Sequence, residues 1–296
     1  MSKRPVPAGY RRDRGFLVPE SFRPAPPTEE AREPFYSWVI RTARAYMRFQ
    51  GLEMTVDGAE HYPVDSGAMI VGNHTGYFDF VHFGVPAFLN GGRLVRFMAK
   101  KELFEHRIAG PMMRWLHHIE VDRFAGAAAL DEAIRRLRAG ALVGIFPEAT
   151  ISRSFEIKDF KTGAARIARD AGVPLIPVTI FGGQRLWAKG GERRLGRSRI
   201  PVWIRAGEPI RPGEDAQETT DRLHAAMVAQ LARLREDYID RYGPFPGGLP
   251  WMPAALGGSA PTLEEANAMD ERDREARRRA HEARKAREAG RNGGGS

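Results

Sequence analysis

His74 and Asp79 are the residues of this sequence best placed for acid–base chemistry. They lie five positions apart in the segment Asn73-His74-Thr75-Gly76-Tyr77-Phe78-Asp79. Residues five apart point about 140° away from each other on a helix and to opposite faces on a strand, so these side chains can meet only across a turn. Gly76 favours such a turn. A histidine held by a carboxylate is a candidate general base.

The flanking residues predict the elements that position this pair. The run Ala68-Met69-Ile70-Val71 is typical of a buried strand, and Phe80-Val81-His82-Phe83 can begin a helix. His74 would then lie at the carboxyl end of a strand, where α/β folds bind their ligands. His117 and Asp122 repeat the spacing. A strand-like stretch without a turn separates those two, so we do not expect them to meet.

Three further motifs follow in order along the chain. They are Val121-Asp122-Arg123, then Phe146-Pro147-Glu148-Ala149-Thr150-Ile151-Ser152-Arg153, then Val173-Pro174-Leu175-Ile176-Pro177-Val178. With the His74 motif they resemble the glycerolipid acyltransferases of the 1-acylglycerol-3-phosphate acyltransferase (PlsC-like) type, whose motifs are commonly written NHxxxxD, (V/I)DR, FPEGTRS and (V/I)P(L/I)xPV. The resemblance covers residues 51–242 and implies one acyltransferase domain there.

The resemblance implies transfer of a fatty acyl group from a thioester donor, acyl-CoA or acyl carrier protein, to a hydroxyl of a lysophospholipid. We expect 1-acylglycerol 3-phosphate as the acceptor and phosphatidate as the product. His74 would take the alcohol proton while Asp79 fixes the imidazole tautomer, and the reaction needs no metal and no other cofactor. Two alternatives stay open: another acceptor on the same fold, such as glycerol 3-phosphate or a different lysolipid, and a noncatalytic lipid-binding protein.

One departure from the family pattern concerns the acceptor. Ile151 stands where the family usually has the arginine credited with gripping the substrate phosphate, and Arg153 lies two positions later. A phosphomonoester carries a charge of about −1.5 to −2, which suits an arginine fork. Glu148 is expected, by resemblance, to help bind the glycerol portion; physically it could accept a hydroxyl hydrogen bond or orient Arg123. The candidate substrate-binding residues are Asn73, Arg123, Glu148, Thr150, Arg153 and Lys161.

Composition limits the class of protein. The 296 residues are 42% hydrophobic, include no cysteine and carry a formal net charge of +9. The absence of cysteine excludes disulfides and a thiol nucleophile and is compatible with a reducing cytoplasm, and the positive charge favours an anionic partner. No stretch supplies the ~20 apolar residues of a spanning helix. We therefore expect a cytoplasmic protein that associates peripherally with the inner face of the cell membrane.

The chain divides into five segments. Residues 1–33 predict a disordered arm, residues 34–50 an amphipathic helix, and residues 51–242 the catalytic domain. Residues 243–261 form a Pro/Gly-rich linker, and residues 262–296 a charged tail that is helical or disordered. The helix at 34–50 either lies in a lipid interface or packs on the catalytic core. The basic segment from Arg185 to Arg199 either meets anionic lipid or is a solvated loop.

Short β-type runs alternate with helical patterns from residue 51 onward. We predict strands at 69–71, 94–98, 119–121, 141–146, 175–181 and 201–204, and helices at 80–89, 111–117, 127–138 and 163–169. A long helix, begun by Asp215 and Glu218, follows them. This alternation predicts an α/β fold with a mainly parallel central sheet flanked by helices.

Other functional classes lack their signatures. The chain has no Gly-x-Ser-x-Gly elbow of a serine hydrolase, no His-Glu-x-x-His zinc motif and no Gly-x-Gly-x-x-Gly dinucleotide fingerprint. Its basic residues are interspersed with glutamates in the tail, and no nucleic-acid-reading module is recognisable. We expect no specific nucleic-acid partner.

Overall fold

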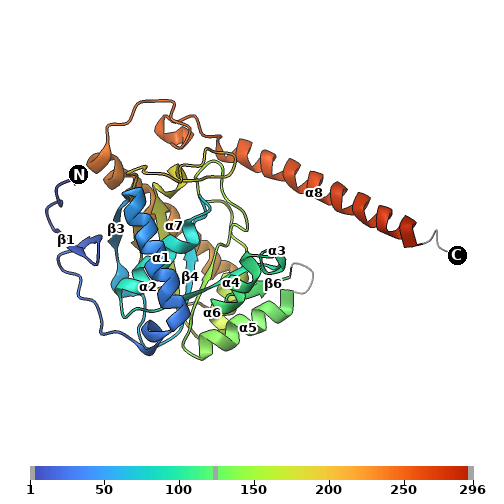
Figure 1. Ribbon diagram of the computed structural model, residues 1–296, viewed down its shortest axis with the longest axis horizontal. Coiled ribbons are helices and arrows are strands. Elements are labelled where there is room, and N and C mark those ends of the chain that lie inside the picture. The colour runs from blue at the N-terminus through green and yellow to red at the C-terminus, as the bar shows by residue number, and fades with distance from the viewer. Residues whose placement is uncertain (1–3, 123–125, 293–296) are drawn as a thin grey trace. The chain divides into compact units, whose positions relative to one another are not determined.

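A computed structural model describes residues 4–122 and 126–292 of the chain (Figure 1). The chain forms two compact units. The first contains residues up to Ser152 together with Ile157–Phe245, and the second contains Arg153–Glu156 together with the residues from Pro246 onward. The motif residues from Asn73 to Glu148 lie in the first unit.

The first unit is built on one sheet with the strand order β1-β2-β3-β9-β8-β4-β7-β5-β6. The four central neighbours β8, β4, β7 and β5 pair in parallel, and β8 pairs antiparallel with β9. The predicted α/β fold with a mainly parallel sheet is therefore confirmed. The strands are β1 (Tyr10–Asp13), β2 (Phe16–Pro19), β3 (Glu53–Asp57), β4 (Ala68–Gly72), β5 (Val95–Lys100), β6 (Ile119–Val121), β7 (Leu142–Ile145), β8 (Leu175–Phe181) and β9 (Pro201–Ala206).

Helices cover both faces of this sheet. α5, α6 and α7 pack on one face, and α2 packs on the other with α1 beside it. The helices are α1 (Pro34–Gln50), α2 (Asp79–Leu89), α3 (Lys101–Glu105), α4 (Ala109–Trp115), α5 (Gly126–Arg138), α6 (Gly163–Ala171), α7 (Ala216–Tyr242) and, in the second unit, α8 (Leu263–Asn292). Short 3-10 turns occur at Glu29–Arg32, Ala59–His61, Gly183–Arg185 and Ala254–Leu256.

Burial on both faces explains why the central strands could be predicted from the sequence. Every residue of β4 and of β8 is buried, as expected for strands covered by helices on both faces. Helix ends follow local chemistry: Pro34 occupies the first position of α1, and Gly51 ends it in the left-handed conformation at φ 70°. The Asp215 side chain caps α7 by accepting the N–H groups of Gln217 and Glu218.

The disordered arm expected for residues 1–33 is not what residues 10–19 form. They make the strands β1 and β2, and β2 pairs in parallel with β3 at the edge of the sheet. Phe16, Leu17 and Val18 are buried there. Such a short apolar run gains its stability from a distant partner strand, and no local pattern reveals that partner.

Helix α1 spans the segment 34–50 predicted as an amphipathic helix. Met47 and Gln50 are buried against the rest of the first unit, whereas the side chains of Trp38 and Phe49 are 55% and 57% exposed. The helix therefore packs on the catalytic core and still presents aromatic side chains to the surroundings.

The second unit consists of the residues around Arg153 together with the C-terminal segment. Thr262 and Glu265 form a reciprocal capping box at the start of α8. Within this unit the Arg153 guanidinium donates to Asp270 at 2.6 Å and to Asp273 at 2.9 Å. Across the described residues, no helix has both the length and the apolar character needed to cross a membrane.

Candidate active site

The loop between β4 and α2 brings His74 and Asp79 together. His74 follows the carboxyl end of β4, and Asp79 is the first residue of α2. The His74 Nδ1 atom lies 3.0 Å from Asp79 Oδ2. The same oxygen accepts the backbone N–H groups of Thr75 at 2.6 Å and Gly76 at 2.8 Å. The turn expected at Gly76 thus folds the loop around the carboxylate.

These contacts fix which nitrogen of His74 is basic. Asp79 is fully buried, and the His74 side chain is 21% exposed. Because the Nδ1–H group donates to the carboxylate, the lone pair of the neutral ring lies on Nε2. The arrangement can accept a proton from an incoming hydroxyl group.

Residues 146–152 also fix the backbone of His74 and its imidazole ring. Its N–H donates to Glu148 Oε1 at 3.0 Å, and its carbonyl oxygen accepts the Ser152 N–H at 2.7 Å. The imidazole stacks on Phe146 with 4.1 Å between ring centroids and 16° between planes. The segment 146–152 therefore forms one wall of the site, as its place in the motif order suggested.

The Glu148 side chain accepts hydrogen bonds from two backbone N–H groups. Besides the His74 N–H, its second oxygen accepts the Lys158 N–H at 3.4 Å. Burial raises the pKa of Glu148 to about 8, an effect that the two backbone donors partly offset. Each oxygen of this carboxyl thus already holds a backbone group, whereas sequence resemblance suggested a contact with the glycerol portion of the substrate.

Asn73 has a similar bridging position. It is buried, its Oδ1 accepts the Ile180 N–H at 2.8 Å, and its Nδ2 donates to the Ile180 carbonyl at 3.1 Å. The side chain thus joins the end of β4 to β8. This geometry supports a role in positioning the loop, and both polar ends of the side chain bond to the backbone of one residue, Ile180.

The candidate phosphate ligands do not form a described cluster as His74 and Asp79 do. Arg123 lies outside the described residues. Lys161 is exposed and Thr150 is half-buried in the first unit, and Arg153 belongs to the second unit, paired with Asp270 and Asp273. The structure therefore brings together His74, Asp79, Asn73 and Glu148 and leaves the phosphate contacts as predictions.

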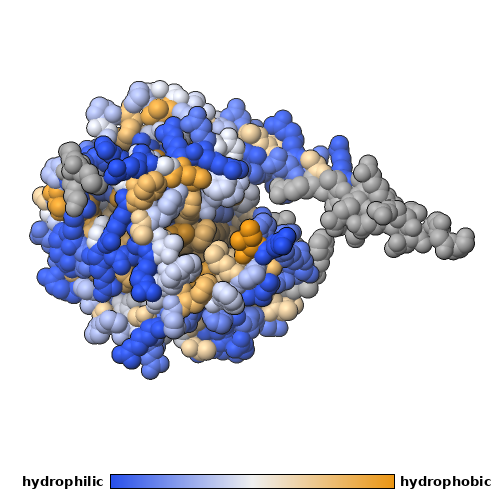
Figure 2. All heavy atoms as spheres, viewed as in Figure 1, coloured by the Kyte–Doolittle hydropathy of each residue, from blue (hydrophilic) through white to orange (hydrophobic). Residues whose placement is uncertain are grey.

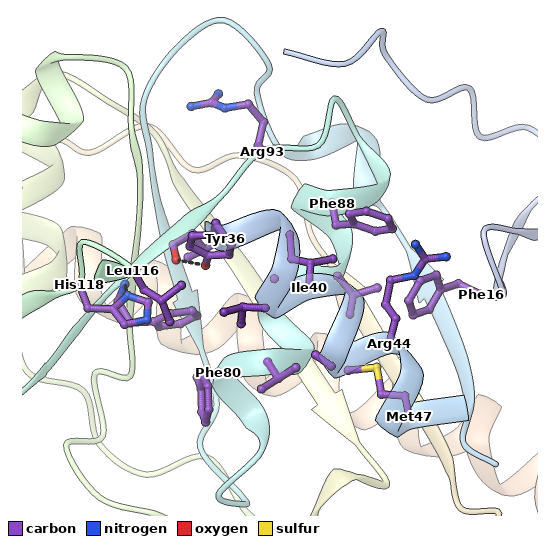
Figure 3. Close-up of a pocket in the computed structure, with 17 residues that line it drawn as sticks. Phe16, Tyr36, Ile40, Arg44, Met47, Phe80, Phe88, Arg93, Leu116 and His118 are labelled. Carbon is purple, nitrogen blue, oxygen red and sulfur yellow. Dashed lines mark hydrogen bonds between the residues drawn. The ribbon is translucent and has the colours of Figure 1, made fainter. Parts of the chain in front are cut away.

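An apolar cavity of about 90 Å³ lies between α1 and α2 (Figure 3). Phe80, adjacent to Asp79, lines it together with Phe97, and Phe97 stacks on Phe146 at 5.9 Å. Phe146 in turn stacks on His74, so a row of aromatic rings connects the cavity wall to the imidazole. The lining residues are Phe16, Tyr36, Val39, Ile40, Ala43, Arg44, Met47, Phe80, Val81, Gly84, Val85, Phe88, Arg93, Val95, Phe97, Leu116 and His118.

Sequence reasoning missed the cavity and two site residues. The cavity needs two helices far apart in the chain, so no local pattern signals it. Phe146 was noted only as part of a motif, and its stacking on His74 depends on the packing of β7 beside β4. His82 on α2 was noted only as part of a helix, although its position three residues after Asp79 places it on the same helix face.

Comparisons with known proteins identify the family of this chain. A family model described as Acyltransferase matches residues 53–181. The chain is 32% identical to a 1-acyl-sn-glycerol-3-phosphate acyltransferase of Bacillus subtilis over 206 residues, which is 68% of this chain and 96% of that protein. It is 25% identical to the chloroplastic 1-acyl-sn-glycerol-3-phosphate acyltransferase LPAT1 of Arabidopsis thaliana, and there it spans 48% of the relative.

A solved structure shares the fold. The crystal structure of PlsC, the 1-acyl-sn-glycerophosphate (LPA) acyltransferase of Thermotoga maritima, superposes with a TM-score of 0.56 at 27% sequence identity. The match covers 69% of this chain and 83% of that one. The chain therefore belongs to the PlsC-like family of glycerolipid acyltransferases and is an O-acyltransferase.

Proposed function

We propose that the protein transfers a fatty acyl group from acyl-CoA or acyl carrier protein to the free hydroxyl of 1-acylglycerol 3-phosphate, giving phosphatidate. The observation that carries the proposal is the His74–Asp79 pair, with Nδ1 bonded to a buried carboxylate and Nε2 left basic. The relatives named for this reaction support the choice of acceptor.

In this mechanism His74 Nε2 removes the proton from the acceptor hydroxyl as its oxygen attacks the thioester carbonyl carbon. Asp79 stabilises the imidazolium that forms. When the tetrahedral adduct collapses, the carbon–sulfur bond breaks and the thiolate takes the proton from His74. The products are the ester and the free thiol, and the enzyme returns to its starting state without a covalent intermediate.

The cavity between α1 and α2 is the proposed site for the acyl chain. Its walls are mostly apolar, and the ring row from Phe80 through Phe97 and Phe146 leads to His74. Burying methylene groups there is favourable by about 0.8 kcal/mol each. A chain seated along α2 would place its thioester near Asp79 and His74, at the first turn of that helix.

Phosphate binding is proposed for Arg123, Arg153 and Lys161, with Thr150 as a neutral donor. Since Ile151 replaces the arginine of the family motif, the acceptor has to be identified by experiment. The assay supplies each donor with 1-acylglycerol 3-phosphate, glycerol 3-phosphate and other lysolipids, and follows thiol release and the lipid product. Preferred acylation of 1-acylglycerol 3-phosphate supports the proposal; thiol release without an acylated product, or clear preference for another acceptor, contradicts it.

His117 offers a matched control for the site. It is exposed and lies at φ 53°, a backbone conformation that asparagine tolerates. His117→Asn should therefore retain most of the activity, while His74→Ala loses it. Equal loss in both variants would contradict the assignment of the base.

We also propose that the protein works on the inner face of the cell membrane as a peripheral enzyme. Exposed aromatic residues lie on α1 and α4, where Trp38 and Trp115 both contact Phe35. Figure 2 shows apolar side chains between hydrophilic ones on this face. The basic segment from Arg185 to Arg199 contacts α1, because the Tyr46 hydroxyl donates to the Leu195 carbonyl at 2.9 Å.

Vesicle binding tests the membrane partner. Anionic vesicles should retain the protein at low salt, and Trp38→Ser should weaken binding about 10-fold through the lost apolar contact. Binding that is unaffected by Trp38→Ser, or absent on anionic vesicles, would contradict this placement.

A further inference from the structure

A second histidine lies behind the catalytic pair. His82 is on α2, three residues after Asp79, and is 1% exposed. Its Nδ1 atom is buried, as is the Oδ1 atom of Asp79, and neither has a hydrogen-bond partner among the described residues. All three donors to Asp79 reach the other oxygen, Oδ2. Buried polar atoms without partners are rare, so each of these two needs an explanation.

The two atoms share one neighbour. A methyl group built on Gly183 would lie 3.3 Å from His82 Nδ1 and 3.4 Å from Asp79 Oδ1. Both polar atoms therefore lie on the side of Gly183 from which a Cβ atom would project. A water molecule farther out on this side, in van der Waals contact with the Gly183 Cα atom, could accept from an imidazole N–H and donate to the carboxylate oxygen, which satisfies both atoms.

We propose that His82 is a positioning residue for the catalytic pair, connected to Asp79 Oδ1 by one bound water molecule beside Gly183. The Nδ1–H group of His82 donates to the water, and the water donates to Asp79. The carboxylate is then held through both oxygens: one faces His74 and the loop, and the other faces α2 and the turn after β8. The catalytic part of this inference rests on the proposed function.

The protonation state of His82 fits this arrangement. Burial lowers the pKa of His82 to about 4, although the charge of Asp79 acts in the opposite direction. At neutral pH the ring is therefore neutral and carries a single N–H, which can donate a hydrogen bond to the water. If His82 only filled space in the core, a leucine would serve as well, and no buried nitrogen beside Gly183 would lack a partner among the described residues.

Loss of the His82 contact should shift the pH profile in one direction. When Oδ1 loses its donor, Asp79 becomes a stronger acceptor for the His74 N–H, and this stabilises the charged imidazolium. The pH at which His74 becomes neutral therefore rises. The titratable groups around Asp79 are His74, His82 and Glu148, from the loop after β4, from α2 and from the loop after β7. Glu148 is the same in every variant, so comparing variants isolates His82.

Three variants test this. His82→Leu should lower kcat/KM about 10-fold and move the acid limb of its pH profile upward by about 0.5–1 unit. His82→Asn places an amide nitrogen near the position of Nδ1 and should restore most of both. Gly183→Ala puts a methyl group between the Gly183 Cα atom and the two polar atoms, which excludes the water, and should reproduce the upward shift with His82 intact. Thermal unfolding shows whether each variant is folded.

A merely structural His82 would give a different result. His82→Leu would then change stability or kcat while the acid limb stays at its wild-type pH, and Gly183→Ala would have the wild-type profile. Either outcome overturns the positioning role.

A crystal structure of the resting enzyme at high resolution tests the water without any turnover. Density within hydrogen-bond distance of both His82 Nδ1 and Asp79 Oδ1 supports the proposal, and its absence overturns it. If the water is present but no acceptor is acylated, the proposed function fails on its own and the two failures remain distinguishable.

Discussion

Gly84 on α2 gives a quantitative test of where the acyl chain binds. It lines the cavity, and a Cβ atom built on it meets no other atom within 4 Å. A Cβ atom at this position therefore meets no clash. Replacing a helical glycine also favours the folded state by up to about 1 kcal/mol, so the variants should fold.

The expected effect follows from the cavity size. A leucine side chain at Gly84 would take up the space of about three methylene groups of an acyl chain in this cavity of about 90 Å³. Gly84→Leu would exclude about three methylenes at about 0.8 kcal/mol each, or about 60-fold in kcat/KM for a long-chain donor. Gly84→Ala would exclude about one methylene, or about 4-fold. Short-chain donors, which do not reach Gly84, should be used as well as before.

The assay measures kcat/KM for a series of acyl-CoA donors of increasing chain length with one acceptor. Gly213→Leu is the matched control, because Gly213 is exposed and is not among the residues that line the cavity. The long-to-short ratio should fall in the order wild type, Gly84→Ala, Gly84→Leu and stay constant in Gly213→Leu. A uniform loss for all chain lengths, or an unchanged ratio in Gly84→Leu, would refute the acyl-chain assignment.

Three further predictions concern the site and its surroundings. Asp79→Asn should reduce kcat by about 10²–10⁴-fold, because an amide cannot hold the same tautomer of His74; near-normal turnover by a folded variant would contradict its role. Since burial raises the pKa of Glu148 from 4.5 to about 8, the folded state holds this proton more tightly than the unfolded chain, and the contribution of Glu148 to stability falls as the pH rises through that window. The Tm advantage of wild type over Glu148→Gln should therefore be larger at pH 5 than at pH 8, and an advantage that grows with pH would contradict the burial effect. Replacing both Asp270 and Asp273 by asparagine removes the two charged partners of Arg153 and should lower the KM for a phosphorylated acceptor about 5-fold if Arg153 binds phosphate; an unchanged KM would exclude Arg153 as that ligand.

Much of the catalytic unit was predictable because its signals are local. The run from Ala68 to Val71 is apolar on both faces, and it forms a strand buried on both faces. His74, Gly76 and Asp79 together specify a turn that returns a carboxylate to the histidine, and the turn is present.

What sequence reasoning could not supply depends on distant partners. The strand β2 is stabilised by β3, about 40 residues later in the chain, and Asn73 finds its partner in Ile180. Glu148 was expected, by resemblance, to help bind the glycerol portion of the substrate. Its two backbone partners come from separate loops that only the fold brings together. The cavity has the same origin, since α1 and α2 meet only in the folded unit.

In the proposed mechanism His74 is the base that removes the acceptor proton. The most direct measurement is the rate of thiol release and of lipid product formation by His74→Ala compared with wild type, at saturating donor and acceptor. His74→Ala should lose at least about 10²-fold in rate with an unchanged Tm, because no other group replaces the proton transfer. Turnover within a few-fold of wild type by the folded variant would contradict it.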